Sequence, residues 1–192
     1  MPKFCPANKY EEAVEIAQDD PDEGVELLSD LAKKYPSDPS VRHALGVTLL
    51  ELHRPAEALP HFEHALARED RGSETQGNVY VGLMMSYGML GMEIHARRAA
   101  KRARELGLRD IPDPGELRGD LPEGASEKEL LSFEQARFKT MSGRSRQGLS
   151  EMKVFLKRFP DYMPAHNIMT TGYFLLGDLQ NYQKATEDAL GR

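Results

Sequence analysis

The 192-residue chain has no tryptophan, a single cysteine and no excess of positive charge. One cysteine, Cys5, excludes a disulfide framework and a cysteine-based metal site within the chain. No apolar run reaches the roughly 18 residues needed to span a membrane, and the N-terminus lacks the apolar core of a signal peptide. A net charge of −6 and a pI near 5.6 argue against nucleic-acid binding. We therefore expect a cytoplasmic protein with neither a membrane nor a nucleic-acid partner.

Catalytic motifs are also missing, since the chain contains neither G-x-G-x-x-G nor a P-loop. Glu57, His61 and His64 follow one another at one-turn spacing, which can place three metal ligands on one helix face. With no cysteine or second histidine pair nearby, we interpret them as ordinary polar surface residues. Cys5 lies in a terminal segment that cannot hold a thiolate nucleophile in a fixed geometry. The sequence thus predicts no catalytic residue, no metal and no cofactor.

What the chain does contain is a two-helix unit between Pro39 and Gly72. In its first half Leu45, Gly46 and Leu49 fall on one face at helical spacing, and in its second half Ala58 and Phe62 do the same. Pro55 separates the halves and suits the first turn of a helix, where its missing N–H costs nothing. The stretch is therefore predicted to be helix, tight turn, helix.

The same unit recurs along the chain. The residue that opens the contact face of the second helix recurs at separations of 34, 38, 52 and 34 residues, as Gly24, Ala58, Ala96, Gly148 and Tyr182. The residue four positions later is apolar in every copy except the last, and these residues are Leu28, Phe62, Ala100, Met152 and Thr186. Five units are predicted on this recurrence.

The pattern resembles the tetratricopeptide repeat (TPR), whose consensus is W-x2-L-G-x2-Y, then A-x3-F, then Pro, in about 34 residues. Here it reads Arg42-x2-Leu45-Gly46-x2-Leu49 followed by Ala58-x3-Phe62, without the tryptophan and with Asp70 in place of the closing proline. The resemblance implies an all-α fold, a right-handed superhelical array of antiparallel helix pairs (a TPR-like α-solenoid). It also implies a single repeat domain over residues 1–192, with units at about 5–38, 39–72, 77–110, 129–162 and 163–192.

The sequence also predicts three helix starts and one loop within the array. Asp20, followed by Pro21 and Glu23, is predicted to cap a helix, and Ser73-x-x-Gln76 and Ser126-x-x-Glu129 have the form of capping boxes. The first unit has a weak first helix, at roughly residues 8–18, and is interpreted as an N-terminal cap. Residues 111–125, rich in proline, glycine and acidic groups, are expected to form a flexible acidic loop.

Because nothing catalytic is predicted, function is assigned to the concave surface that the first helices line in arrays resembling TPRs. Projecting the repeat onto this chain predicts a partner-binding groove lined by His43, Val47, Leu50, Val81, Met85, Met89, Phe133, Arg137, Met141, Asn167, Thr171 and Phe174. The lining is mostly apolar, and methionine side chains adapt to irregular apolar partners. We therefore expect a non-catalytic adaptor or scaffold that binds an apolar or amphipathic segment of another protein.

Three alternatives accompany this prediction. The chain can be the regulatory or targeting region of a longer enzyme whose catalytic domain lies beyond residue 192. An edge of Leu179, Tyr182 and Leu190, uncovered by a further helix, can pair with a second copy to form a homodimer. The arginine-rich stripe from Arg97 to Arg104 can contact phosphate, although a solvated helix face is the simpler interpretation.

Overall fold

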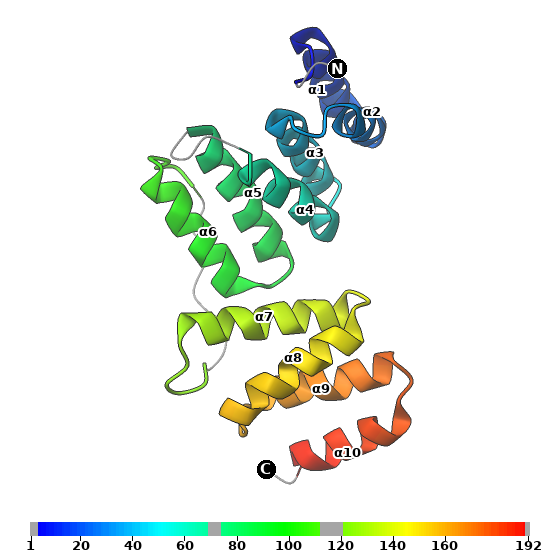
Figure 1. Ribbon diagram of the computed structural model, residues 1–192, viewed down its shortest axis with the longest axis vertical. Coiled ribbons are helices and arrows are strands. Elements are labelled where there is room, and N and C mark those ends of the chain that lie inside the picture. Colours follow the sequence, from blue (N-terminus) through cyan, green and yellow to red (C-terminus); the bar gives the residue numbers. More distant parts are fainter. Residues whose placement is uncertain (1–3, 69–73, 112–120, 191–192) are drawn as a thin grey trace. The chain divides into compact units, whose positions relative to one another are not determined.

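A computed structural model describes residues 4–68, 74–111 and 121–190, and all regular secondary structure in these ranges is helical. Consecutive helices pair through short turns, and each pair is in direct contact (Figure 1). The helices are α1 (Ala7–Asp19), α2 (Pro21–Lys34), α3 (Pro39–Glu51), α4 (Pro55–Leu66), α5 (Glu74–Met89), α6 (Glu93–Glu105), α7 (Glu127–Met141), α8 (Ser145–Arg158), α9 (Met163–Leu175) and α10 (Leu179–Leu190). The predicted all-α architecture of helix pairs is thus confirmed.

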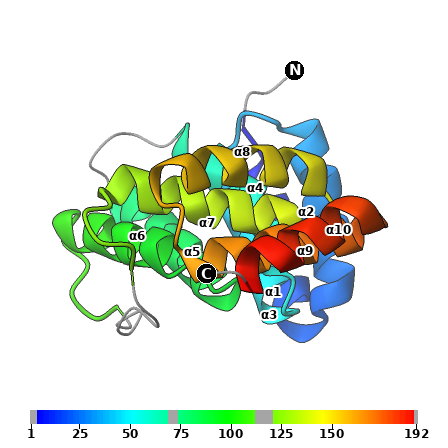
Figure 2. The same ribbon diagram turned by 90° about the horizontal axis from the view of Figure 1, so that it is seen from below.

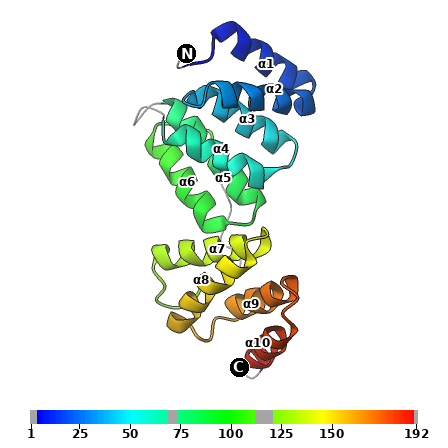
Figure 3. The same ribbon diagram turned by 45° about the vertical axis from the view of Figure 1, so that its right-hand side comes forward.

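The chain divides into two compact units, each larger than one of the predicted repeats. Unit 1 is residues 1–116 and contains α1 to α6, and unit 2 is residues 117–192 and contains α7 to α10. In unit 1 each helix from α1 to α6 packs on the next, and α1, α2 and α3 form successive layers (Figure 3). In unit 2 the helices α7 to α10 pack in the same way, with α7 and α8 side by side (Figure 2). The predicted single domain and superhelical hand concern the placement of the two units and stay predictions. Among the described helices, none is long and apolar enough to cross a membrane.

Side-chain caps begin α2 and α7, as the sequence predicts. The Asp20 carboxylate accepts hydrogen bonds from the backbone N–H groups of Asp22 and Glu23, at 3.2 and 3.1 Å, ahead of α2. Ser126 and Glu129 form a complete capping box at the start of α7. The predicted box at Ser73 and most of the 111–125 loop, residues 112–120, lie outside the described residues.

The recurring positions confirm the register of the repeat. Gly24, Ala58, Ala96 and Gly148 are all buried. Four residues further along, each copy places a fully buried side chain, and these are Leu28, Phe62, Ala100 and Met152. In the last copy Tyr182 and Thr186 are not buried in this way, which matches their departure from the pattern.

The turns inside the helix pairs follow the same register. Gly91, Gly143 and Gly177 adopt φ values of 65°, 82° and 67° in the turns before α6, α8 and α10. The equivalent residue before α4 is His53, with φ 56°, although a side chain disfavours this left-handed region. One backbone conformation therefore serves four of the turns, whatever residue occupies it.

Two glycines allow close helix contacts in unit 1. The ring of Phe62 in α4 lies against Gly46 of α3 and Gly82 of α5. A Cβ atom added to Gly46 would lie 2.8 Å from this ring, and one added to Gly82 would be closer still. The two glycines therefore make room for one buried aromatic ring that joins three helices from two repeats.

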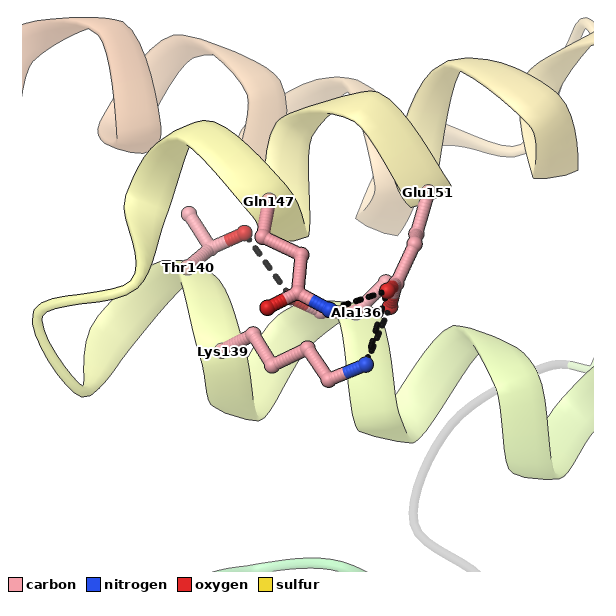
Figure 4. A network of polar contacts seen from close by, with 5 residues as sticks. All are labelled: Ala136, Lys139, Thr140, Gln147 and Glu151. Carbon is pink, nitrogen blue, oxygen red and sulfur yellow. Dashed lines mark hydrogen bonds and ion pairs between the residues drawn. The ribbon is translucent and has the colours of Figure 1, made fainter.

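In unit 2, α7 and α8 are held together by an aromatic cluster and by a group of polar contacts. Phe133 of α7 stacks 5.1 Å from Phe155 of α8, and Tyr162 meets Phe133 edge-on at 5.3 Å. The Lys139 ammonium of α7 donates to both carboxylate oxygens of Glu151 in α8, at 2.7 and 2.9 Å, and the amide of Gln147 donates to the same carboxylate (Figure 4). In the same helix pair, Gly148 of α8 packs against Thr140 of α7.

Arg42 connects the first two repeats and also pairs with His61. Arg42 Nη1 of α3 lies 3.1 Å from His61 Nδ1 of α4, and Arg42 Nη2 donates to the Ala32 carbonyl of α2. Since a guanidinium can only donate, His61 Nδ1 must accept and its proton lies on Nε2. Burial, and then the charges of Arg42 and His64, lower the pKa of His61. The pair therefore requires a neutral imidazole.

The Phe62 junction predicts opposite effects for two glycines of α5. Gly82→Ala forces a methyl group against the Phe62 ring and should lower the free energy of unfolding by about 1–3 kcal/mol. Gly88→Ala meets no atom within 4 Å and should be neutral or stabilise by up to about 1 kcal/mol through helix propensity. Urea denaturation of both variants measures the difference, and equal effects would show that Phe62 does not lie where the structure places it.

The Arg42–His61 pair predicts a pH dependence of stability. Because folding lowers the pKa of His61 below its ordinary value of 6.5, the unfolded chain binds the proton more readily. The contribution to stability is complete well above pH 6.5 and is lost as the pH falls from there through the folded-state pKa. Thermal melting at neutral and at mildly acidic pH should show this loss, and His61→Gln should make it smaller. An unchanged slope in His61→Gln would contradict the assignment.

Candidate functional site

Within unit 1, the predicted groove residues that remain exposed lie on α3 and α5. Val47 of α3 is 37% exposed, and Met85 and Met89 of α5 are 47% and 44% exposed. Val81, four residues before Met85, is half-buried on the same side of α5. These four residues lie on two helices that contact each other directly, and the set is called the α3–α5 face.

Two residues of this face are next in sequence to the glycines that contact Phe62. Val47 follows Gly46 and Val81 precedes Gly82, and both of these glycines contact Phe62. A β-branched valine is therefore adjacent to each of the two glycines at which α3 and α5 contact α4. The position of the face is fixed by a buried ring rather than by the surface residues themselves.

His43 forms the polar border of the α3–α5 face. Its half-buried ring meets the Phe62 ring edge-on at 5.8 Å and forms a hydrogen bond to the backbone of Asn78 in α5. Burial lowers the pKa of His43, and the bond to Asn78 opposes this shift only in part. At neutral pH the imidazole is therefore uncharged, and the face carries no formal charge from this residue.

Two predicted groove residues lie in the core. Leu50 and Phe133 are each 8% exposed, and Phe133 belongs to the aromatic cluster of unit 2. Leu50 is buried in α3 together with Leu49. Neither side chain offers surface to a partner, so neither belongs to the candidate binding surface.

The remaining predicted residues belong to unit 2 and form a separate set. Met141 and Phe174 are 54% and 63% exposed, and Asn167 is also exposed. Arg137 and Thr171 are half-buried, and the Thr171 hydroxyl donates to the Asn167 carbonyl. Since α7 and α9 contact each other as α3 and α5 do, the α3–α5 face is set apart by its composition, which is apolar at all four positions.

The candidate metal ligands are each engaged elsewhere. Glu57 accepts two hydrogen bonds from Arg54, at 2.7 and 2.8 Å, while His61 bonds to Arg42 and His64 Nε2 donates to the Pro36 carbonyl. Across the described residues, no cluster of three histidine, cysteine or acidic side chains can hold a metal ion.

Cys5 is anchored through its backbone, whose N–H donates to the buried Asp38 carboxylate at 2.8 Å. Burial and then the Asp38 charge raise the pKa of the Cys5 thiol, which disfavours the thiolate that a nucleophile needs. Cys5 is therefore not activated as a nucleophile.

Two features of the surface were not predicted from the sequence. Leu175 and Leu176 are exposed beside Phe174 at the end of α9. Leu179 and Leu190 of α10, which the homodimer hypothesis names, are exposed as well, and that hypothesis stays a prediction.

The second unpredicted feature is a cavity between α4, α5 and α6. Its only signal in the sequence is the seven-residue spacing of Tyr80 and Tyr87.

Comparison with known proteins gives structural neighbours only. No protein-family model and no curated protein matches the chain. Among solved structures, the chain is similar to YrrB, described as a TPR protein with an unusual peptide-binding site, at 14% identity and a TM-score of 0.48, covering 96% of this chain and 84% of YrrB.

Two further structures are similar over the same share of this chain. TTC0263, a thermophilic TPR protein of Thermus thermophilus, has 18% identity and a TM-score of 0.46, with 96% of this chain and 89% of TTC0263 covered. MamA AMB-1 has 15% identity and a TM-score of 0.42, with 96% of each chain covered.

The assignment of the fold rests on this chain's own geometry. Of the five helix pairs in the described residues, four share one turn conformation and four share a register of buried contact residues. The chain is therefore a tetratricopeptide-type array of helix pairs.

Proposed function

We propose that this protein is a non-catalytic interaction module, an adaptor or scaffold, that binds an apolar or amphipathic segment of another protein on the α3–α5 face. The observation that carries the proposal is the exposure of Val47, Met85 and Met89 on two contacting helices. Isolated exposed apolar residues are ordinary, but a contiguous apolar face marks a binding surface more often.

An amphipathic helix is the partner that fits this face. Val81, Met85 and Met89 follow one another at four-residue spacing along α5, and Val47 extends the face onto α3. A helix with apolar anchors at spacings of three, four and seven residues can bury such a strip. The two methionines adapt their shape to the anchors, which favours tolerance of different partner sequences.

The expected affinity is modest. Burial of apolar surface contributes about 25 cal/mol per Å2, and a few hundred Å2 would offset the cost of association and leave binding in the micromolar range. Neutral His43 at the border adds no charge that an apolar partner would have to desolvate.

The test uses a double variant, Met85→Asp with Met89→Asp, and a designed amphipathic helical peptide with leucine anchors as the probe. Two carboxylates on the face should weaken binding by at least about tenfold, because an apolar anchor cannot cover a charge without desolvating it. Fluorescence anisotropy of the labelled peptide measures the affinity, and circular dichroism measures the melting temperature.

Val154→Asp in α8 is the control for an added surface carboxylate, because this apolar residue is 66% exposed in unit 2. It should leave peptide binding unchanged. The proposal is overturned if the control and the double variant weaken binding equally. A collapsed melting transition in the double variant would also sink it, because these residues would then be part of the core.

A further inference from the structure

A cavity of about 290 Å3 lies where α4, α5 and α6 meet in unit 1. Its lining comes from all three helices and consists of Glu63, Leu66, Tyr80, Leu83, Tyr87, His95, Arg98, Ala99 and Arg102. The volume is close to the lower end of cavities that hold small ligands, and is large enough for one or two side chains of a partner.

The cavity has an apolar and an aromatic part. Leu83 and Ala99 are buried and Leu66 is half-buried, so the lining includes apolar surface from each helix. The rings of Tyr87 and His95 lie 4.9 Å apart at 45° and form an aromatic wall. Such a wall favours an aromatic guest, whose ring can stack on it or meet it edge-on.

The charge at the rim is mainly positive and comes from α6. Arg98 and Arg102 are four residues apart, so their guanidinium groups lie on one side of this helix. Arg102 donates to Glu105 at 2.7 Å, whereas Arg98 makes no hydrogen bond or ion pair with any described residue. Glu63, on α4, is the carboxylate of the lining.

We propose that this cavity binds a short acidic-aromatic segment of a partner protein, in which an aromatic side chain enters the cavity and a neighbouring carboxylate pairs with Arg98. The apolar lining and the Tyr87–His95 wall take up the ring. A carboxylate at the exposed Arg98 gains a charge-assisted hydrogen bond. Glu63 excludes an acidic group from the α4 side and so sets the orientation of the segment.

The distribution of charge around the cavity favours a protein ligand over a nucleic acid. Helix α6 carries five basic and two acidic residues, but residues 1–72 carry eight basic and fifteen acidic ones. A long phosphate backbone would be repelled by this acidic part of the chain, whereas a short acidic segment needs only the α6 rim.

The cavity is independent of the α3–α5 face. Tyr87 and Met85 are two residues apart on α5 and therefore point about 200° away from each other. A substitution on one side of α5 can change binding there without touching the other side, so the two proposals are tested separately.

The test uses a fluorescently labelled peptide with both ends blocked and a glutamate-phenylalanine-glutamate centre. Arg98→Glu should weaken its binding by about tenfold, because an attraction becomes a repulsion at an exposed position. Arg104→Glu is the matched control: it makes the same charge change on the same helix, is also exposed and does not line the cavity. It should change the affinity by less than about twofold.

Two altered peptides and one oligonucleotide complete the experiment. Replacing the phenylalanine by serine, or both glutamates by glutamine, should each weaken binding severalfold, and Met85→Asp should have no effect. The proposal is overturned if the parent peptide does not bind, if Arg104→Glu weakens binding as much as Arg98→Glu, or if a single-stranded oligonucleotide binds more tightly than the peptide.

Discussion

The buried Phe62 ring between Gly46 and Gly82 is the contact on which unit 1 depends. A repeat array has no single central core, so each helix pair must bury its apolar side against its neighbour. Phe62 does this for α3, α4 and α5 at once, and the absence of side chains on the two glycines allows it. Gly148 against Thr140, and Gly172 against Leu149, serve the same purpose in unit 2.

This constraint explains why the sequence predicts the fold well. Small residues are needed wherever two helices approach closely, and their recurrence at Gly24, Ala58, Ala96 and Gly148 fixes the register of the pairs. Fully buried Leu28, Phe62, Ala100 and Met152 follow from the same register. The caps at Asp20 and Ser126 can be predicted from the sequence equally well, because side-chain capping is a local interaction.

The surface is less predictable, for a physical reason. A generic repeat gives the direction in which a residue points, but its burial depends on what the neighbouring helix places opposite it. Leu50 and Phe133 occupy positions that the pattern assigns to the groove and yet lie in the core, Phe133 because Phe155 and Tyr162 pack against it. The cavity beside Tyr87 needs side chains from three helices, so no single stretch of sequence reveals it.

Helix α5 consequently has two different sides. Met85 and Met89 give one side an adaptable apolar character, while Tyr80 and Tyr87 border the arginines of α6 on the other. Both sides are held in place by the contact of Gly82 with Phe62. Under the two proposals, this one helix presents two chemically distinct surfaces without a moving part.

The nuclear Overhauser effect at the Phe62 ring, measured in the isotope-labelled protein, tests this junction of helices most directly. The structure predicts cross-peaks from the aromatic protons of Phe62 to the α-protons of both Gly46 and Gly82. Cross-peaks to neither glycine, or to Gly46 alone, would contradict the junction of α3, α4 and α5 and the register of repeats built on it.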